Sequence, residues 1–298
     1  MVRARAAGPD QLGHRQAHGV REPQQDPQGQ QKLRLLSFNI QAGTSTAHYH
    51  HYVTHSWRQI LPHSRRTENL DAIAGMVAPY DMIALQEVDS GSLRSGFINQ
   101  SRYLASQAGM PFWCHQSNRK VGTVAYAGNG FLSRFEPDAV EEFRLPGVIP
   151  GRGSLVVRFG KGKQCLAIAV VHLALGKRAR KLQLEFLSRQ LGQHAHLIVM
   201  GDLNTPVSSP EVQDFCTRLN LSTPTGGMPS YPSWQPQRAI DHILLAKPLL
   251  SINARVVDVA YSDHCPVELE VQLPPGLRLR PAVRPVVSVE SQASEAPD

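Results

Sequence analysis

The sequence predicts a layered α/β fold in which β-sheets pack on one another. Short apolar runs rich in β-branched residues outnumber the segments with helical periodicity. Strands and helices do not alternate strictly along the chain, which favours packed sheets over one doubly wound parallel sheet. With 298 residues, of which 41% are hydrophobic, the chain is long enough to bury a sizeable core.

The expected elements follow in chain order. The first helix is indicated by Leu70, Ile73, Ala74 and Val77, which share one helical face. Strands are expected at 33–40, 81–85, 131–132, 139–143, 154–159, 164–173, 197–200, 240–245, 252–257 and 267–273, and helices at 67–77, 98–108 and 180–191. The polar, Gly- and Pro-rich segments 1–32 and 274–298 are expected to be a flexible arm and a flexible tail around a folded core, 33–273.

Composition excludes several classes of protein. No apolar run approaches the roughly 18–20 residues that a membrane-spanning helix needs, so no stable membrane insertion is expected. The formal net charge of +7 suits an anionic ligand but does not demand nucleic acid. The four cysteines are widely spaced without a C-x-x-C pair, and the N-terminus lacks a signal-peptide-like stretch. We therefore expect a cytoplasmic protein, and a monomer.

Polar residues at strand ends are the candidates for chemistry. Asn39 lies near the end of the first strand, and Glu87 follows the second. A carboxylate and an amide carbonyl there can bind a hard cation, although a solvated strand end is the alternative for Glu87. His172 ends a strongly apolar strand, where a buried structural histidine is the alternative.

Three further segments carry acidic residues. Asp202 and Asn204 follow the strand 197–200 and, on an extended backbone, point the same way, with an Asx turn as the alternative. Asp241 interrupts an apolar strand and therefore needs a partner. Asp263 and His264 are adjacent, so their side chains diverge, and Asp241 is free to hydrogen-bond the His264 imidazole.

In this order the motifs resemble the endonuclease/exonuclease/phosphatase superfamily. The motifs are Ser-Phe-Asn-Ile (37–40), Gln-Glu-Val (86–88), Gly-Asn-Gly-Phe-Leu-Ser-Arg (128–134), Val-His-Leu (171–173), Gly-Asp-Leu-Asn (201–204), Ile-Asp-His-Ile (240–243) and Ser-Asp-His-Cys-Pro-Val (262–267). The resemblance covers roughly residues 33–273. It implies a four-layer α/β/β/α sandwich with the site at one end, between the two sheets.

The resemblance also implies a role for each residue. A divalent metal, usually Mg²⁺ with Mn²⁺ as a substitute, is expected on Glu87 with help from Asn39, and Asp263 falls at or beside the metal. Asp202 and Asn204 are expected to position water and phosphate oxygens. His264, paired with Asp241, is expected to be the acid/base group, with His172 as a second histidine and Asn129 near the phosphate. Gln41 stands where some members carry an acidic residue, which puts a second metal in doubt.

The substrate is less defined. The loop before Asp241 contains Trp234 and Arg238, which are expected to contact substrate, although Trp234 packing on the core is an equal alternative. Arg152 and Arg134 are expected to add positive charge at the mouth. The basic run 176–181 suits a polyanion or a solvated helix start. The histidines at 48, 50, 51 and 55 are expected to be incidental.

These observations predict a metal-dependent hydrolase of phosphoesters, more specifically a phosphodiesterase. Its partner is a phosphate-containing substrate: nucleic acid, phospholipid or a small phosphodiester. A nucleic-acid endonuclease of the same superfamily is the alternative within the enzyme class. A catalytically inactive binding module is the alternative from a different class.

Overall fold

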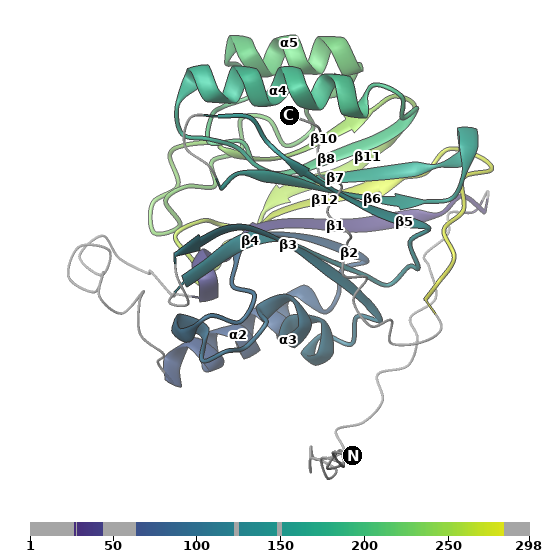
Figure 1. The fold of residues 1–298 in the computed structure, drawn as a ribbon. Coiled ribbons are helices and arrows are strands. Elements are labelled where there is room, and N and C mark those ends of the chain that lie inside the picture. Colours follow the sequence, from purple (N-terminus) through teal and green to yellow (C-terminus); the bar gives the residue numbers. More distant parts are fainter. Residues whose placement is uncertain (1–26, 28, 44–63, 122–124, 148–150, 283–298) are drawn as a thin grey trace, which may run out of the picture.

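The computed structural model describes residues 27, 29–43, 64–121, 125–147 and 151–282, which form four layers (Figure 1). Two six-stranded sheets pack face to face in this part of the chain. The first sheet has the order β11-β12-β1-β2-β4-β3, and the second has the order β5-β6-β7-β8-β10-β9. Helices α2 and α3 cover the first sheet, and α4 and α5 cover the second. The four-layer α/β/β/α expectation is confirmed.

The elements have the following bounds. The first sheet contains β1 (Lys32–Asn39), β2 (Met82–Val88), β3 (Phe112–Val121), β4 (Ala125–Ser133), β11 (Leu250–Val256) and β12 (Val267–Gln272). The second contains β5 (Ala139–Arg144), β6 (Gly153–Phe159), β7 (Leu166–His172), β8 (His196–Asp202), β9 (Leu221–Ser222) and β10 (Asp241–Ala246). The helices are α2 (Ser64–Val77), α3 (Gln100–Gln107), α4 (Lys177–Leu191) and α5 (Pro210–Leu219).

Strand alternation divides the core into an inner layer and two outer layers. On β1, Leu33 and Leu35 face the second sheet, whereas Leu36 and Phe38 face α2 and α3. On the other side of the molecule, apolar residues of α4 and α5 pack on the outer face of the second sheet. Strands buried on both faces explain why their sequences read as nearly continuous apolar runs.

Strand direction brings the candidate residues to one end of both sheets. Strand β1 is parallel to β2 in the first sheet, and β7 is parallel to β8 in the second, so the strands of each pair finish at the same end of their sheet. Strands β4, β6, β10 and β12 run antiparallel to these strands and therefore begin at that end. Residues that end one set of strands thus meet residues that begin the other set.

Three elements and one terminal segment differ from the expectation. Strands β3 and β9 and helix α5 were not expected, since β3 is polar in its second half and α5 is short and starts at Pro210. Residues 274–282 were expected to be flexible, but Leu277 and Leu279 are buried in the inter-sheet core, and Ala282 N donates to the carbonyl of Arg134. The folded body therefore extends at least to Ala282. The histidines at 48–55 lie outside the described residues.

Gly201 allows close packing beside Asp202. Its φ is +148°, and a Cβ added there would lie 1.9 Å from the carbonyl oxygen of Val171 on β7. We therefore expect Gly201→Ala to lower the free energy of unfolding by about 1–3 kcal/mol, because the two strands must separate. Urea denaturation measures this change. As a control, Gly75→Ala on exposed α2 meets no atom within 4 Å and should stabilise the protein slightly.

Among the residues that the structure describes, no helix combines the length and the apolar character needed to cross a bilayer.

Candidate active site

Two rows of polar side chains face each other where the inner core ends. On the first sheet, Asn39, Gln86, Asn129 and Gln116 are register partners across β1, β2, β4 and β3. On the second sheet, Asp241, Asp202 and His172 are register partners across β10, β8 and β7. Each row shares the strand face of the inter-sheet core. A bond from Asn39 Nδ2 to Asp202 Oδ2, at 3.3 Å, joins the rows.

Glu87 joins this space because of a backbone irregularity. Strict alternation on β2 would turn Glu87 to the outer face, since Gln86 shares the inner face of Met82 and Ala84. The register with β4 shifts between Gln86 and Val88, and Glu87 adopts a left-handed φ of +57°. Glu87 Oε1 then lies 3.9 Å from His172 Nε2 on the opposite sheet. Glu87 was expected just after a strand but lies in a bulge within it.

Asp241 and His264 form a buried pair. Nδ1 of His264 lies 2.8 Å from Oδ2 of Asp241, and the same oxygen accepts a bond from the Ser230 hydroxyl at 2.6 Å. Burial disfavours the charged imidazole, but the charge and hydrogen bond of Asp241 outweigh burial and raise the pKa of His264 to about 10. His264 is therefore an imidazolium ion at neutral pH, with its other ring nitrogen available.

Asp202 occupies the centre of the site. Its Oδ1 accepts a bond from the backbone N–H of Asn204 at 2.8 Å. Burial and the charge of Asp241 raise the pKa of Asp202 to about 7, against the opposing effect of His264. The charge of Glu87 contributes to this rise, which places Glu87 within electrostatic reach of Asp202.

His172 lies between the carboxylates and an arginine. Its Nε2 is 3.5 Å from Asp202 Oδ2, and Nη1 of Arg152 lies 2.7 Å from its Nδ1. Burial, and then the charges of Arg152 and His264, hold the pKa of His172 well below its usual value. The two histidines of the site are therefore opposite in charge state: His172 is neutral and His264 is protonated.

Asp263 lies at the border of the site. Its Oδ2 accepts a bond from Gln41 Nε2 at 3.2 Å, and its Oδ1 accepts one from the Ser262 hydroxyl at 3.2 Å. Burial raises the pKa of Asp263, and the charge of Glu87 adds to the rise. Gln41 thus hydrogen-bonds to an acidic residue of the site.

Asn204 was expected to lie on an extended backbone that continues the strand, but it does not. Strand β8 ends at Asp202, and Asn204 has a left-handed φ of +54°. Its backbone N–H donates to Oδ1 of Asp202, which is the hydrogen bond of the Asx turn given as the alternative. Its side-chain Nδ2 donates to the carbonyl of Leu173 at 2.8 Å. Asn204 remains half-exposed beside Asp202.

Asn129 lies in the amide row. Its Nδ2 donates to the carbonyl of Gly153 at 2.9 Å, which joins β4 to the start of β6. Its Oδ1 is buried without a hydrogen-bond partner among the described residues.

The loop before β10 covers His264. The Tyr231 ring lies 4.8 Å from the His264 ring, centroid to centroid, and Ser233 N donates to the carbonyl of Asp263 at 2.8 Å. Arg238 is exposed and lies over Tyr231, 5.7 Å from the ring centroid. Trp234 is half-buried. Ser230 and Tyr231 were not predicted as site residues, although Tyr231 begins the loop 231–238 that was expected to overhang the site and Ser230 directly precedes it.

Arg134, which was expected at the mouth, and Arg180, which belongs to the basic run 176–181, have structural partners instead. Arg134 lies at the opposite end of β4, where its Nε donates to the carbonyl of Tyr80 at 3.0 Å. Arg180, in the basic run of α4, is buried and pairs with Glu211 at 3.1 Å. Lys177 and Arg178 of the same run are exposed.

The donor set suits a divalent cation. Asp202, Asp241 and His264 have ligand atoms within 4.8 Å of one another, and Glu87 and Asp263 interact electrostatically with this group. Burial is the main cause of the raised pKa values of Asp202 and Asp263, and the charge of Glu87 adds to both, so this buried space carries an excess of acidic groups. Oδ1 of Asp241 also lacks a partner among the described residues. A hard cation with oxygen ligands would relieve this excess.

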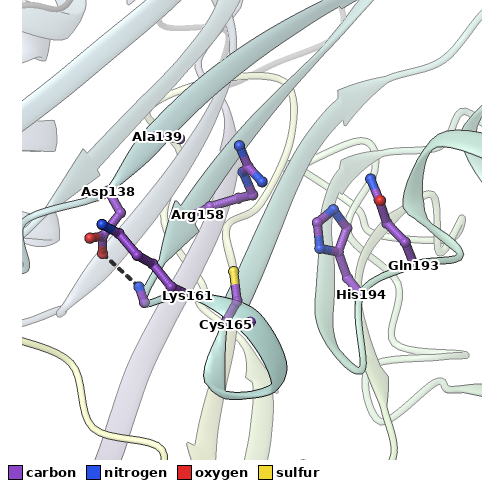
Figure 2. A pocket seen from close by; sticks show the side chains of 9 residues that line it. Asp138, Ala139, Arg158, Lys161, Cys165, Gln193 and His194 are labelled. Atoms are coloured by element: carbon purple, nitrogen blue, oxygen red, sulfur yellow. Dashed lines mark hydrogen bonds between the residues drawn. The ribbon is translucent and has the colours of Figure 1, made fainter.

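A separate cleft of about 390 Å³ lies at the other end of the second sheet (Figure 2). It is lined by Asp138, Ala139, Arg158, Gly160, Lys161, Gly162, Cys165, Gln193 and His194. Two of its charged groups have local partners: Asp138 accepts a bond from Gly160 N at 2.7 Å, and Arg158 pairs with Glu141 at 2.6 Å. The candidate active site is therefore the polar rim between the sheets, not this cleft.

The family follows from a direct match. A model of the Endonuclease/Exonuclease/phosphatase family matches residues 36–264, the segment that contains both polar rows. The chain belongs to this family. The family assignment confirms the resemblance inferred from the motifs, while the roles of individual residues stay predictions. Comparison with curated proteins finds no match.

Solved structures share the fold. A family member from Bacteroides thetaiotaomicron is 16% identical, with a TM-score of 0.62 over 82% of this chain and 99% of that chain. A mannosyl-6-phosphatase of the same species is 17% identical, with a TM-score of 0.60 over 80% and 99%. The human Nocturnin catalytic domain, solved with a sulfate anion, is 18% identical, with a TM-score of 0.57 over 80% and 94%. At these identities the likeness concerns the fold.

Proposed function

We propose that the protein is a divalent-metal-dependent phosphodiesterase in which water is the nucleophile. The observation that carries this proposal is the meeting of Glu87, Asp202 and the Asp241–His264 pair at one rim, although they lie on three separate strands, β2, β8 and β10, and in the loop before β12. Such a set combines ligands for a cation, a carboxylate whose pKa lies near neutral pH and a positively charged imidazole. Each of these kinds of group can assist phosphoester hydrolysis, by proton transfer or by stabilising the charge that develops.

We assign the cation, Mg²⁺ or Mn²⁺, to Glu87 with Asn39 and Asp263. Bound there, it would neutralise phosphate charge and polarise the phosphorus centre as a Lewis acid. Asp241 is assigned to hold His264, because its Oδ2 accepts bonds from His264 Nδ1 and the Ser230 hydroxyl.

The remaining residues act on water and substrate. Asp202, with a pKa of about 7, accepts a proton from the attacking water, and Asn204 beside it orients the water or a phosphate oxygen. His264 donates its free ring N–H to a phosphate or leaving oxygen. His172 and Asn129 supply neutral polar contacts, while Arg152 supplies positive charge next to His172.

Hydrolysis of phosphoesters, the broader part of the proposal, is supported by the family and by the names of two members. The mannosyl-6-phosphatase acts on a phosphorylated sugar, and Nocturnin binds sulfate, an analogue of phosphate, in its crystal. Hydrolysis of bis-p-nitrophenyl phosphate with Mg²⁺ or Mn²⁺, beside the monoester p-nitrophenyl phosphate, tests the proposal. We expect faster turnover of the diester and loss of turnover with EDTA. A rate unaffected by EDTA would contradict the metal dependence, and faster monoester turnover would contradict the diesterase assignment.

Removing the charge of Glu87 should weaken metal binding. Glu87→Gln keeps the size of the side chain but removes a carboxylate, the ligand type that Mg²⁺ prefers. We expect the Mg²⁺ concentration for half-maximal activity, and the calorimetric dissociation constant, to rise by at least about tenfold. Glu185→Gln on α4 is a matched control, because that carboxylate only faces Lys181 at 3.9 Å. Unchanged affinity in Glu87→Gln would place the metal elsewhere.

A nucleic-acid endonuclease is the second candidate. The exposed side chains of Lys177, Arg178 and Arg238 lie on segments at the same edge as the site, which favours a polyanion. Nicking of supercoiled plasmid at low salt, with a steep loss of rate as salt increases, would support this candidate. Equal hydrolysis of small diesters at all salt concentrations, without nicking, would exclude it.

A further inference from the structure

Gln86 carries a buried amide that the folded protein leaves unused. The residue is fully buried, and neither Nε2 nor Oε1 has a hydrogen-bond partner among the described residues. Burying an amide without hydrogen-bond partners costs free energy, so a ligand that supplies a partner would be bound favourably. The other amides of its row differ in this respect, since Asn39, Asn129 and Gln116 each donate at least one hydrogen bond.

The position of Gln86 directs this amide toward the active site. Its register partners are Asn39 on one side and Asn129 on the other, and Asn39 reaches Asp202 across the sheets. Residues in register on neighbouring strands share a face, so Gln86 points toward the strands that carry Asp202 and His172. The next residue is Glu87. The acceptor atom of Asn129 beside it, Oδ1, also lacks a partner among the described residues.

We propose that Gln86 is a phosphate-binding residue whose Nε2 donates a hydrogen bond to a phosphoryl oxygen of the substrate. This inference rests on the proposed function and extends it to a residue that the motif analysis used only as the neighbour of Glu87. A neutral donor fits this place, because another positive charge would compete with the cation for the surrounding carboxylates. Binding of phosphate supplies the partner that the amide lacks.

Gln86→Met separates this role from a structural one. Methionine has a similar length and shape but no amide, so the variant removes an unsatisfied polar group from the interior. We expect the melting temperature to be unchanged or higher. At the same time, we expect KM for bis-p-nitrophenyl phosphate and the inhibition constant of inorganic phosphate to rise by at least about tenfold, the loss of one hydrogen bond to a charged group.

Gln31→Met is the matched control. Gln31 is also buried, but its Oε1 accepts a bond from Leu279 N at 2.9 Å, at the start of β1 and far from the site. This variant should have a lower melting temperature and unchanged kinetics. Opposite changes in the two variants would support the role of Gln86.

Two results would overturn the inference. An unfolded or clearly destabilised Gln86→Met would mean that the amide supports the fold, and unchanged KM and phosphate inhibition would mean that it does not contact phosphate. If the wild type hydrolyses no diester, the proposed function fails instead. Calorimetric titration of inorganic phosphate with Mg²⁺ into both proteins then still tests Gln86.

Discussion

Replacing His264 by Gln is expected to lower the rate of phosphodiester hydrolysis by about 10²–10⁴-fold. The imidazole is held by Asp241 at 2.8 Å and covered by Tyr231, and its pKa of about 10 makes it a proton donor at neutral pH. Glutamine retains a donor to Asp241 but cannot transfer a proton. The loss should appear in kcat with bis-p-nitrophenyl phosphate at saturating Mg²⁺.

Two comparisons make this result specific. Asp241→Asn should also reduce kcat, and the double variant should be little worse than either single variant, because the pair acts as one unit. Mg²⁺ affinity measured by calorimetry should remain within a few-fold of wild type in His264→Gln, since we assign the metal to Glu87. Wild-type turnover in His264→Gln would remove the Asp241–His264 pair from the mechanism.

Glu211→Gln is expected to destabilise the protein by about 3–5 kcal/mol, the usual cost of breaking a buried ion pair. Glu211 is nearly fully buried on α5, and Arg180 on α4 lies 3.1 Å from its Oε1. The substitution leaves the guanidinium cation buried with only carbonyl partners, such as that of Leu175. Urea denaturation at neutral pH measures the change.

The matched control is an exposed pair on the same helix. Arg218 and Asp214 of α5 form an ion pair at 2.8 Å, and both side chains are about half exposed. Arg218→Ala should therefore cost at most about 1 kcal/mol. The double change Arg180→Met with Glu211→Leu should recover most of the stability lost in Glu211→Gln, since no unpaired charge remains. Equal effects of Glu211→Gln and Arg218→Ala would contradict the importance of burial.

Much of the fold was predictable because burial leaves a periodic pattern. The apolar runs 33–40, 154–159 and 197–200 all became strands, and the leucine stripe from Leu184 to Leu191 became the inner face of α4. Helix α5 was not predicted, and strand β3 was not predicted because its second half is polar. The packing of 274–282 depends on Leu277 and Leu279, two isolated leucines without a strand or helix pattern.

The sequence by itself determined the family, the sheet-on-sheet fold and the residue types of the site, because motif order and apolar periodicity are local properties of the chain. The tertiary structure alone decided how these residues meet. The left-handed backbone at Glu87 brings its carboxylate into the space between the two sheets. The left-handed backbone at Asn204 accompanies the hydrogen bond from its N–H to the Asp202 carboxylate. The tertiary structure also decided the charge states, because burial and then Arg152 lower the pKa of His172, whereas Asp241 raises that of His264.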